Sequence, residues 1–403
     1  MLSRRTLLLA LLLLVIACTG IAQPGPPVIR VLFIGNSYTF YNDLPAILAR
    51  LAGDGGRAKV ETGMVAPGGW GLKDHWEKGN AHQALRAARW NYVVLQDRSQ
   101  LGFDYFVDGQ PHIASDEFFR PYAEKWANEI RNATVTPVFY LTWARKDSPQ
   151  DQAALNYAYI SAARRTHAVV VPAGIAWAEV RRRYPDLELF DPDGSHPSPA
   201  GSYLAACVLY ASIFHVSPNG LTSRITARGD KTSVLVDLPP KQARILQSAA
   251  WDAYQLLRKN GGYLDVQPPP APSPAPLPQG EPLSASNLEG RWSGELLFYP
   301  GVGPVRMVLE LHRDDDTWKG HLELHYPVKD FADESLDLVD LKVGKQEITF
   351  SHPASTGVAK LRVDFRGVLN ADAELRGTAQ ARQLTPDLPP VVVLGEWKLR
   401  KQR

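Results

Sequence analysis

A proline-rich segment separates two parts of this 403-residue chain that differ in hydrophobic pattern. Residues 267–278 read Gln-Pro-Pro-Pro-Ala-Pro-Ser-Pro-Ala-Pro-Leu-Pro. Because proline fixes φ and has no backbone N–H, the segment favours an extended polyproline II spacer over a helix or a sheet strand. We therefore expect one domain at residues 28–260, a linker at 262–286 and a second domain at 287–403.

Short apolar runs alternate with helical patterns in the first part. The runs predict strands at 30–34, 59–65, 92–96, 137–143 and 168–172, and the helical patterns include 115–131, 150–167, 175–183, 199–214 and 241–259. This alternation is typical of an α/β domain, in which helices cover both faces of a mostly parallel sheet.

The second part alternates apolar and polar residues between turn signals. It predicts eight strands, at 290–298, 305–312, 318–326, 338–342, 347–351, 360–368, 374–381 and 391–399. We expect an all-β barrel or sandwich. Gly290-x-Trp292 near its start and Gly395-Glu-Trp397 near its end resemble a lipocalin-like barrel.

The first 22 residues have the pattern of an export signal. Arg4 and Arg5 precede an apolar run, residues 7–17, that is too short to span a bilayer. Both the general secretory route and the twin-arginine route fit this pattern. Residues 15–18, Val-Ile-Ala-Cys, resemble a bacterial lipobox, which implies cleavage before Cys18 and a lipid anchor there; the alternative is an ordinary cleavage after Ala22. We expect an exported protein, lipid-anchored in a bacterial envelope or otherwise periplasmic or secreted.

Composition excludes several classes of protein. The chain is 45% hydrophobic and 21% charged, as is typical of globular domains, and its net charge of +2 comes from the two arginines of the export signal. The balanced charge argues against a nucleic-acid partner. Cys207 lies in an apolar helical run and is expected to be buried, so the chain has no disulfide framework.

Ser37 lies where a buried strand gives way to a helix. Apolar residues 31–34 are followed by Gly35 and Asn36, and a helical pattern begins near Asp43. In α/β enzymes this strand-to-helix junction holds reacting groups, and backbone N–H groups there can face an anion. Two interpretations are open on this segment alone: Ser37 is a nucleophile, or it caps a helix.

Asp193 and His196 form the best pair to activate a serine. They stand three residues apart on the loop Asp191-Pro-Asp-Gly-Ser-His-Pro, directly before the helical pattern at 199–214. On a tight loop this spacing lets the carboxylate accept a hydrogen bond from imidazole Nδ1–H while Nε2 faces outward. A serine nucleophile needs such a base, held in one tautomer by an acid.

Gly35-Asn36-Ser37 and Asp193-x-x-His196 resemble the first and fifth sequence blocks of the SGNH (GDSL-like) hydrolases. The resemblance implies a flavodoxin-like three-layer α/β/α domain and esterase activity. It also implies that Ser37 is the nucleophile, His196 the base and Asp193 the residue that orients it. Asn36 replaces the aspartate that is usual in this family.

The resemblance further implies an oxyanion hole with three donors. These are the Ser37 N–H, a glycine after the second strand and an asparagine after the third. We assign the glycine to Gly69, with Gly68 as the alternative. Gln96 stands where the family has asparagine, and it is either a longer amide donor or only a strand-end residue.

Residues at the same sheet edge are candidates to bind the substrate, each with packing as the alternative: Trp143, Tyr38, Trp70 and Arg145. The mechanism needs no metal or organic cofactor. An exported enzyme of this type would act on acyl or acetyl esters, with carbohydrate esters expected first and lipid esters second. The competing class is a catalytically silent surface protein that binds a glycan or lipid.

Overall fold

The computed structural model describes residues 27–101, 105–107, 110–113, 116, 119–227, 233–268, 277–297, 304–327, 332–355, 360–384 and 392–402. The predicted export signal with Cys18 lies outside the described residues, as does most of the proline-rich segment.

The first sheet is parallel and has five strands among the described residues. They are β1 (Val28–Ile34), β2 (Lys59–Val65), β3 (Tyr92–Leu95), β6 (Thr136–Tyr140) and β7 (Val169–Val171), in the order β2-β1-β3-β6-β7. This order is that of a flavodoxin-like sheet, so the predicted α/β fold is confirmed. The central strands β1, β3 and β6 follow from apolar runs whose side chains are buried on both faces of the sheet, whereas the edge strand β2 has only Val60 buried.

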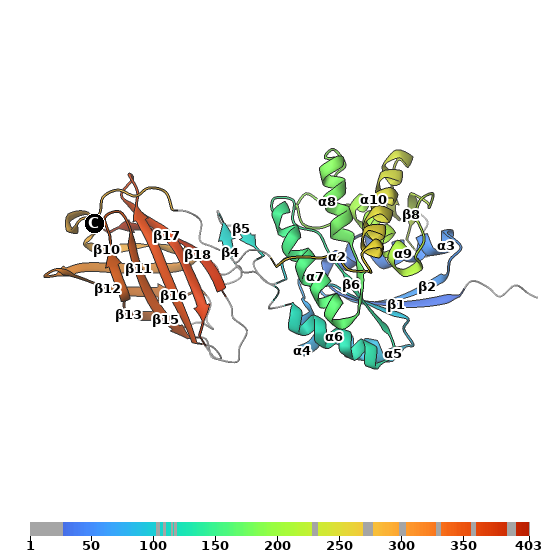
Figure 1. The fold of residues 1–403 in the computed structure, drawn as a ribbon, viewed down its shortest axis with the longest axis horizontal. Helices are drawn as coiled ribbons and strands as arrows, with labels where there is room; N and C mark the ends of the chain where they lie inside the picture. Colours follow the sequence, from blue (N-terminus) through green and yellow to red (C-terminus); the bar gives the residue numbers. More distant parts are fainter. Residues whose placement is uncertain are drawn as a thin grey trace, which may run out of the picture.

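Helices cover both faces of this sheet (Figure 1). One face packs against α3 (Leu44–Asp54), α8 (Ala173–Arg183), α9 (Pro199–Phe214) and α10 (Pro240–Lys259); the other packs against α4 (Leu72–Glu77), α5 (Ala81–Ala87), α6 (Arg120–Asn132) and α7 (Gln152–Thr166). Side chains alternate along β1, so Val31 and Phe33 join the first core and Leu32 and Ile34 the second. Cys207 is buried in α9, as predicted.

Shorter elements connect these layers or precede the second sheet. They are α2 (Ser37–Phe40), η1 (Tyr41–Asp43), β4 (Tyr105–Val107), β5 (Gln110–His112), η2 (Pro149–Asp151), β8 (Arg224–Thr226), β9 (Val234–Asp237) and α11 (Ala285–Leu288).

The second sheet is antiparallel, and the described residues after 289 contribute nine strands to it. They are β10 (Gly290–Leu297), β11 (Val305–Asp314), β12 (Thr317–His325), β13 (Glu334–Asp337), β14 (Val339–Val343), β15 (Ile348–Ser355), β16 (Lys360–Leu369), β17 (Glu374–Gln383) and β18 (Val392–Lys401). The order runs from β13 through β10 and β18 to β14, and His352 of β15 hydrogen-bonds Glu334 of β13, so the two ends of the sheet approach each other. Trp292 and Trp397 are buried in its core. The predicted all-β domain is confirmed. The structure has one strand that was not predicted, β13, because its single apolar residue gave no alternating signal.

The parallel sheet determines where the site lies. Chain connections run in opposite directions from β1 and β3, and the carboxyl ends of such neighbouring strands form the usual binding position of open α/β sheets. Ser37 follows β1, Gln96 follows β3, and the loop that holds Asp193 and His196 leads into α9.

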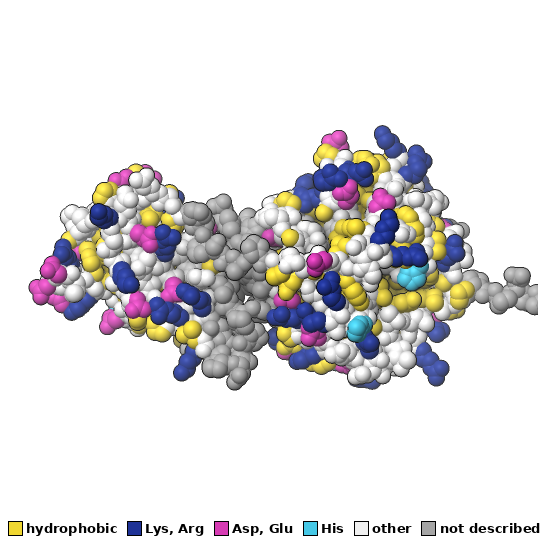
Figure 2. Space-filling view, in the orientation of Figure 1, with side chains coloured by type: hydrophobic (Ala, Val, Ile, Leu, Met, Phe, Trp, Pro, Cys, Tyr) yellow, Lys and Arg dark blue, Asp and Glu magenta, His cyan; other side chains and the backbone are white. Residues whose placement is uncertain are grey.

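Two surface observations bear on partners. On the face shown in Figure 2, basic and acidic side chains are interspersed, in line with the balanced composition. None of the helices within the described residues combines the length and apolarity needed to cross a membrane.

The start of α9 depends on a close contact at Gly201. A Cβ atom there would lie 2.3 Å from the Leu189 carbonyl oxygen and 2.4 Å from the Trp177 ring. We predict that Gly201→Ala lowers the free energy of unfolding of the α/β domain by about 1–3 kcal/mol in urea titrations, because the buried contact must open.

The matched control is Gly53→Ala in α3, where a Cβ atom would meet nothing within 4 Å. Alanine has the higher helix propensity, so this variant should be as stable as the wild type or more stable. If Gly201→Ala unfolds at the same urea concentration as Gly53→Ala, the packing described for α9 is wrong.

Candidate active site

Ser37 begins a single helical turn that Asn36 caps. The Asn36 side-chain oxygen accepts a hydrogen bond from the Tyr38 N–H at 3.1 Å, and the Asn36 backbone carbonyl oxygen accepts one from the Thr39 N–H at 2.9 Å. Asn36 is thus the cap, and the Ser37 hydroxyl is available for another contact. We call residues 35–39 the serine turn.

Ser37, His196 and Asp193 form one hydrogen-bonded chain. His196 Nε2 lies 2.8 Å from Ser37 Oγ, and His196 Nδ1 hydrogen-bonds Asp193 Oδ2. Asp193 Oδ1 accepts hydrogen bonds from the backbone N–H groups of Ser195 and His196, each at 2.9 Å. A carboxylate on Nδ1 holds the proton there, so Nε2 is the atom that can accept the serine proton.

Asp193 is held in its ionised form. Desolvation opposes ionisation, but the hydrogen bonds from the His196 side chain and from the Ser195 and His196 N–H groups outweigh it and lower the pKa of Asp193 to about 2. The carboxylate therefore stays charged across the ordinary pH range and can orient the imidazole throughout it.

Aromatic rings fix the histidine from two sides. Tyr41 stacks on the His196 ring at a centroid distance of 4.2 Å, and Tyr38 meets it edge-on at 5.6 Å. Tyr38 also stacks on Trp143 at 4.8 Å. The Tyr38 hydroxyl lies 2.7 Å from Ser195 Oγ, and Trp143 Nε1 donates to the Ser195 carbonyl oxygen at 3.1 Å. These contacts hold the loop that carries His196, residues 191–197, which we call the histidine loop.

The interpretation of Trp143 and Tyr38 as substrate-binding residues is wrong. Trp143 has no exposed surface and Tyr38 is 3% exposed. Both side chains belong to the packing beneath the histidine loop, and burial raises the pKa of Tyr38, which keeps its hydroxyl protonated. Periodicity could not separate these roles, because an aromatic residue after a strand can face either solvent or core.

Gln96 also differs from its predicted role. Its side chain is fully buried. Its amide oxygen accepts from the Asn36 N–H and from Thr39 Oγ1, each at 2.9 Å. Its amide nitrogen donates to Asn36 Oδ1 at 2.9 Å and to the Asp97 carbonyl oxygen. A glutamine amide has two N–H donors, and both are used in these contacts, so no N–H is left to bind an oxyanion. We therefore remove Gln96 from the oxyanion hole.

Residues 67–71, which we call the glycine turn, lie beside the serine turn. Asn36 Nδ2 donates to the Trp70 carbonyl oxygen at 2.8 Å. Gly69 has a φ of 73° and is exposed, and a Cβ atom there would meet nothing within 4 Å. Gly69 and the Ser37 N–H remain the predicted oxyanion donors. Trp70 is half-buried against His75, at a centroid distance of 5.3 Å.

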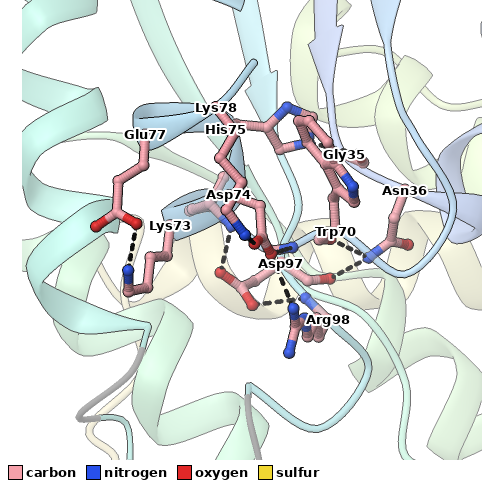
Figure 3. Close-up of polar contacts among 12 residues, drawn as sticks. Gly35, Asn36, Trp70, Lys73, Asp74, His75, Glu77, Lys78, Asp97 and Arg98 are labelled. Atoms are coloured by element: carbon pink, nitrogen blue, oxygen red, sulfur yellow. Dashed lines mark hydrogen bonds and ion pairs between the residues drawn. The ribbon is translucent and has the colours of Figure 1, made fainter. Parts of the chain in front are cut away.

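Asp97 and His75 support the site but were not singled out from the sequence (Figure 3). Asp97 Oδ2 accepts from the Leu72 N–H at 2.9 Å, and the buried His75 lies with Nε2 2.7 Å from the Gly35 carbonyl oxygen. Burial lowers the pKa of His75, so it donates to this carbonyl as a neutral ring. The position of Asp97 directly after Gln96 was a signal for its role, whereas nothing in the local sequence distinguished His75.

Arg145 lies beside the histidine loop. It is half-buried, and the N–H of the next residue, Lys146, donates to the Gly194 carbonyl oxygen at 2.8 Å. Arg145 stays a candidate to contact substrate. Among the described residues, no group of three or more His, Cys, Asp or Glu side chains is arranged to hold a metal ion.

Comparisons with known proteins give similarities of fold. No protein-family model matches the chain, and no curated protein does. Solved structures that match include a DUF4886 family protein from Bacteroides uniformis, with 18% identity, a TM-score of 0.45 and coverage of 60% of this chain and 98% of that one. A lipolytic protein of the G-D-S-L family from Desulfitobacterium hafniense, described as putative, has 15% identity, a TM-score of 0.33 and coverage of 46% and 99%. An acetylxylan esterase from Geobacillus stearothermophilus, solved as a catalytic mutant, has 11% identity, a TM-score of 0.36 and coverage of 49% and 96%.

The fold agrees with what the sequence resemblance implies. The strand order and the position of Ser37 after β1 are those implied by the resemblance to SGNH hydrolases, which is confirmed at the level of the fold.

Asp97 should give the α/β domain a specific dependence on pH. Burial raises the pKa of Asp97 to about 6 against the hydrogen bonds from Leu72 and Arg98. The folded state therefore holds this proton more tightly than the unfolded state. The stability that this group contributes is full below about pH 4 and is lost as the pH rises through about 6.

We predict that the free energy of unfolding of the wild type, relative to Asp97→Asn, falls by about 2–3 kcal/mol between pH 3.5 and 7.5 in urea titrations. Ser248→Ala, which removes no titratable group from the exposed face of α10, should keep the wild-type pH profile. Parallel profiles for the wild type and Asp97→Asn would show that Asp97 titrates normally.

Proposed function

We propose that this protein is an exported serine esterase of the SGNH type. The observation that carries the proposal is the continuous chain Ser37 Oγ, His196 Nε2, His196 Nδ1 and Asp193 Oδ2, assembled from two segments more than 150 residues apart. A capped helical turn alone would explain neither the histidine at 2.8 Å from the serine nor the carboxylate behind it.

The geometry supports acyl transfer in two half-reactions. The Ser37 hydroxyl oxygen attacks the ester carbonyl carbon while its proton passes to His196 Nε2. Backbone N–H groups of Ser37 and Gly69 bind the oxyanion that forms. The carbon–oxygen bond to the alcohol then breaks, and His196 gives the proton to the departing alcohol. Water attacks the acyl-enzyme in the same way, with His196 as base, and releases the carboxylic acid and Ser37.

The finer parts of the proposal concern substrate and location. We propose acetyl or other acyl esters on carbohydrate as the substrate class, because a protein with the predicted export signal meets polysaccharide outside the cytoplasm. The similar structures include three mutants of one enzyme, described as an acetylxylan esterase or an acetyl-xylooligosaccharide esterase. We further propose that Cys18 carries a lipid anchor in a bacterial envelope.

Substitutions of the proposed triad test the activity. We predict that Ser37→Ala and His196→Ala lower kcat/KM for a short-chain aryl ester by about 10³-fold or more, and Asp193→Asn by about 10²–10⁴-fold, because each breaks the proton path. Ser248→Ala, on the exposed face of α10, is the control and should keep wild-type kinetics.

The same assay separates the enzyme from the competing class of protein. A catalytically silent glycan- or lipid-binding protein would show no hydrolysis above that of Ser37→Ala, under conditions where thermal melts show both proteins folded. That result with both aryl esters and acetylated xylo-oligosaccharides would exclude the proposed esterase.

The lipid anchor has an independent test. We predict that Cys18→Ser moves the expressed protein from the membrane pellet to the soluble fraction, because the acylated residue with its two chains is lost. Cys207→Ala, which changes the buried thiol in α9, should leave partitioning unchanged. Membrane association that persists in Cys18→Ser would show that this cysteine is not the anchor.

A further inference from the structure

Gln96 occupies the position where the related family has an oxyanion donor, yet its amide faces the serine turn. We propose that Gln96 is a positioning residue that sets the serine turn through Asn36 and does not itself bind the oxyanion. The inference rests on the proposed function, because it concerns how the same site is held.

The contacts of Gln96 form a reciprocal pair with Asn36. The Asn36 backbone N–H donates to Gln96 Oε1 at 2.9 Å, and Gln96 Nε2 donates to Asn36 Oδ1 at 2.9 Å. Thr39 Oγ1, at the far end of the serine turn, donates to the same Gln96 oxygen. One buried amide thus binds both ends of the turn that carries Ser37.

Gly35 makes room for this arrangement. A Cβ atom at Gly35 would lie 2.6 Å from Gln96 Oε1 and 2.5 Å from Thr39 Oγ1. The glycine before Asn36 is therefore required by the approach of the glutamine amide, and its φ is not in the left-handed region.

The same pair fixes the glycine turn. Asn36 Nδ2 donates to the carbonyl oxygens of Trp70, at 2.8 Å, and Asp97, at 3.2 Å (Figure 3). Asp97 in turn accepts from the Leu72 N–H, and a Cβ atom at Gly71 would come within 2.9 Å of Asp97 Oδ1. Through these contacts Gln96 and Asp97 hold the serine turn and the glycine turn, which carry both predicted oxyanion donors.

The two departures from the family pattern, Asn36 and Gln96, are explained by the same set of contacts. An aspartate at position 36 would direct a carboxylate oxygen at two carbonyl oxygens in a buried site, where asparagine donates two N–H groups. An asparagine at position 96 would be one methylene too short to make the Gln96 contacts from the same strand end. Asn36 and Gln96 are therefore complementary to each other.

A double-mutant cycle tests whether the two amides act as one unit. We expect Gln96→Met and Asn36→Ala each to lower kcat/KM for the aryl ester by about 10–100-fold through displacement of the serine turn, mostly in kcat. The kcat/KM of the double variant should be no more than about twofold below that of the less active single variant. Losses that multiply, as for an independent oxyanion donor, or a Gln96→Met enzyme with wild-type kcat/KM, would overturn the inference.

Gln247→Met separates positioning from a general loss of stability. Gln247 is 2% exposed and donates to the Tyr203 hydroxyl at 2.7 Å, within the packing of α9 and α10. This control should lose stability to a similar extent but keep wild-type kcat/KM below its unfolding temperature. If Gln247→Met loses activity as Gln96→Met does, the effect is one of stability alone and the inference fails.

Two further readouts keep the inference distinct from the proposed function. Ser37→Ala in the same assay reports on the function: wild-type hydrolysis by that variant would reject the esterase mechanism but not the amide pair. Hydrogen exchange of a peptide that covers residues 35–40 needs no activity. It should be faster in Gln96→Met than in wild type and unchanged in Gln247→Met; equal exchange in Gln96→Met and wild type would overturn the inference.

Discussion

The parallel pairing of β1 with β3 is the constraint on which the site depends. Ile34 lies opposite Leu95, and the Gln96 N–H donates to the Ile34 carbonyl oxygen at 2.9 Å. This register brings the ends of the two strands together, so the residues that follow must share one buried volume. Asn36 and Gln96 fill it with complementary amides, and the position of Ser37 follows from that pairing. The pairing of two apolar strands thereby fixes the position of the Ser37 hydroxyl group.

The histidine loop is positioned by different physics. It is not part of the sheet, and it is held from below by the stacked rings of Tyr38, Trp143 and Trp177, the last two at a centroid distance of 3.7 Å. Aromatic stacking contributes about 0.5–1.5 kcal/mol per pair beyond area burial, so a continuous stack gives a rigid support. The hydrogen bonds of Ser195 to Tyr38 and Trp143 transmit that rigidity to His196. The packing that buries these aromatic residues therefore also positions His196, the proposed base.

Much of this arrangement could be predicted from the sequence, for identifiable reasons. Strand runs such as 31–34 and the Asp193-x-x-His196 loop carry local signals, because hydrophobic periodicity and turn residues are properties of adjacent positions. The roles of Gln96, Tyr38 and Trp143 could not be predicted, since each depends on a partner far away in the chain. Gln96 contacts Asn36 across 60 positions, and His75 reaches Gly35 across 40. The short strand β13 was not predicted for a related reason: its pairing with β12, rather than its own residue pattern, makes it a strand.

The central claim is that Ser37 is a nucleophile activated by His196. It is tested most directly by treating the purified protein with a fluorophosphonate and locating the adduct by peptide mass spectrometry. The account predicts a single phosphonyl adduct on Ser37, formed at a much lower rate in His196→Ala, whose serine turn should remain intact. An adduct on another residue, or one that forms on Ser37 equally fast without His196, would contradict it.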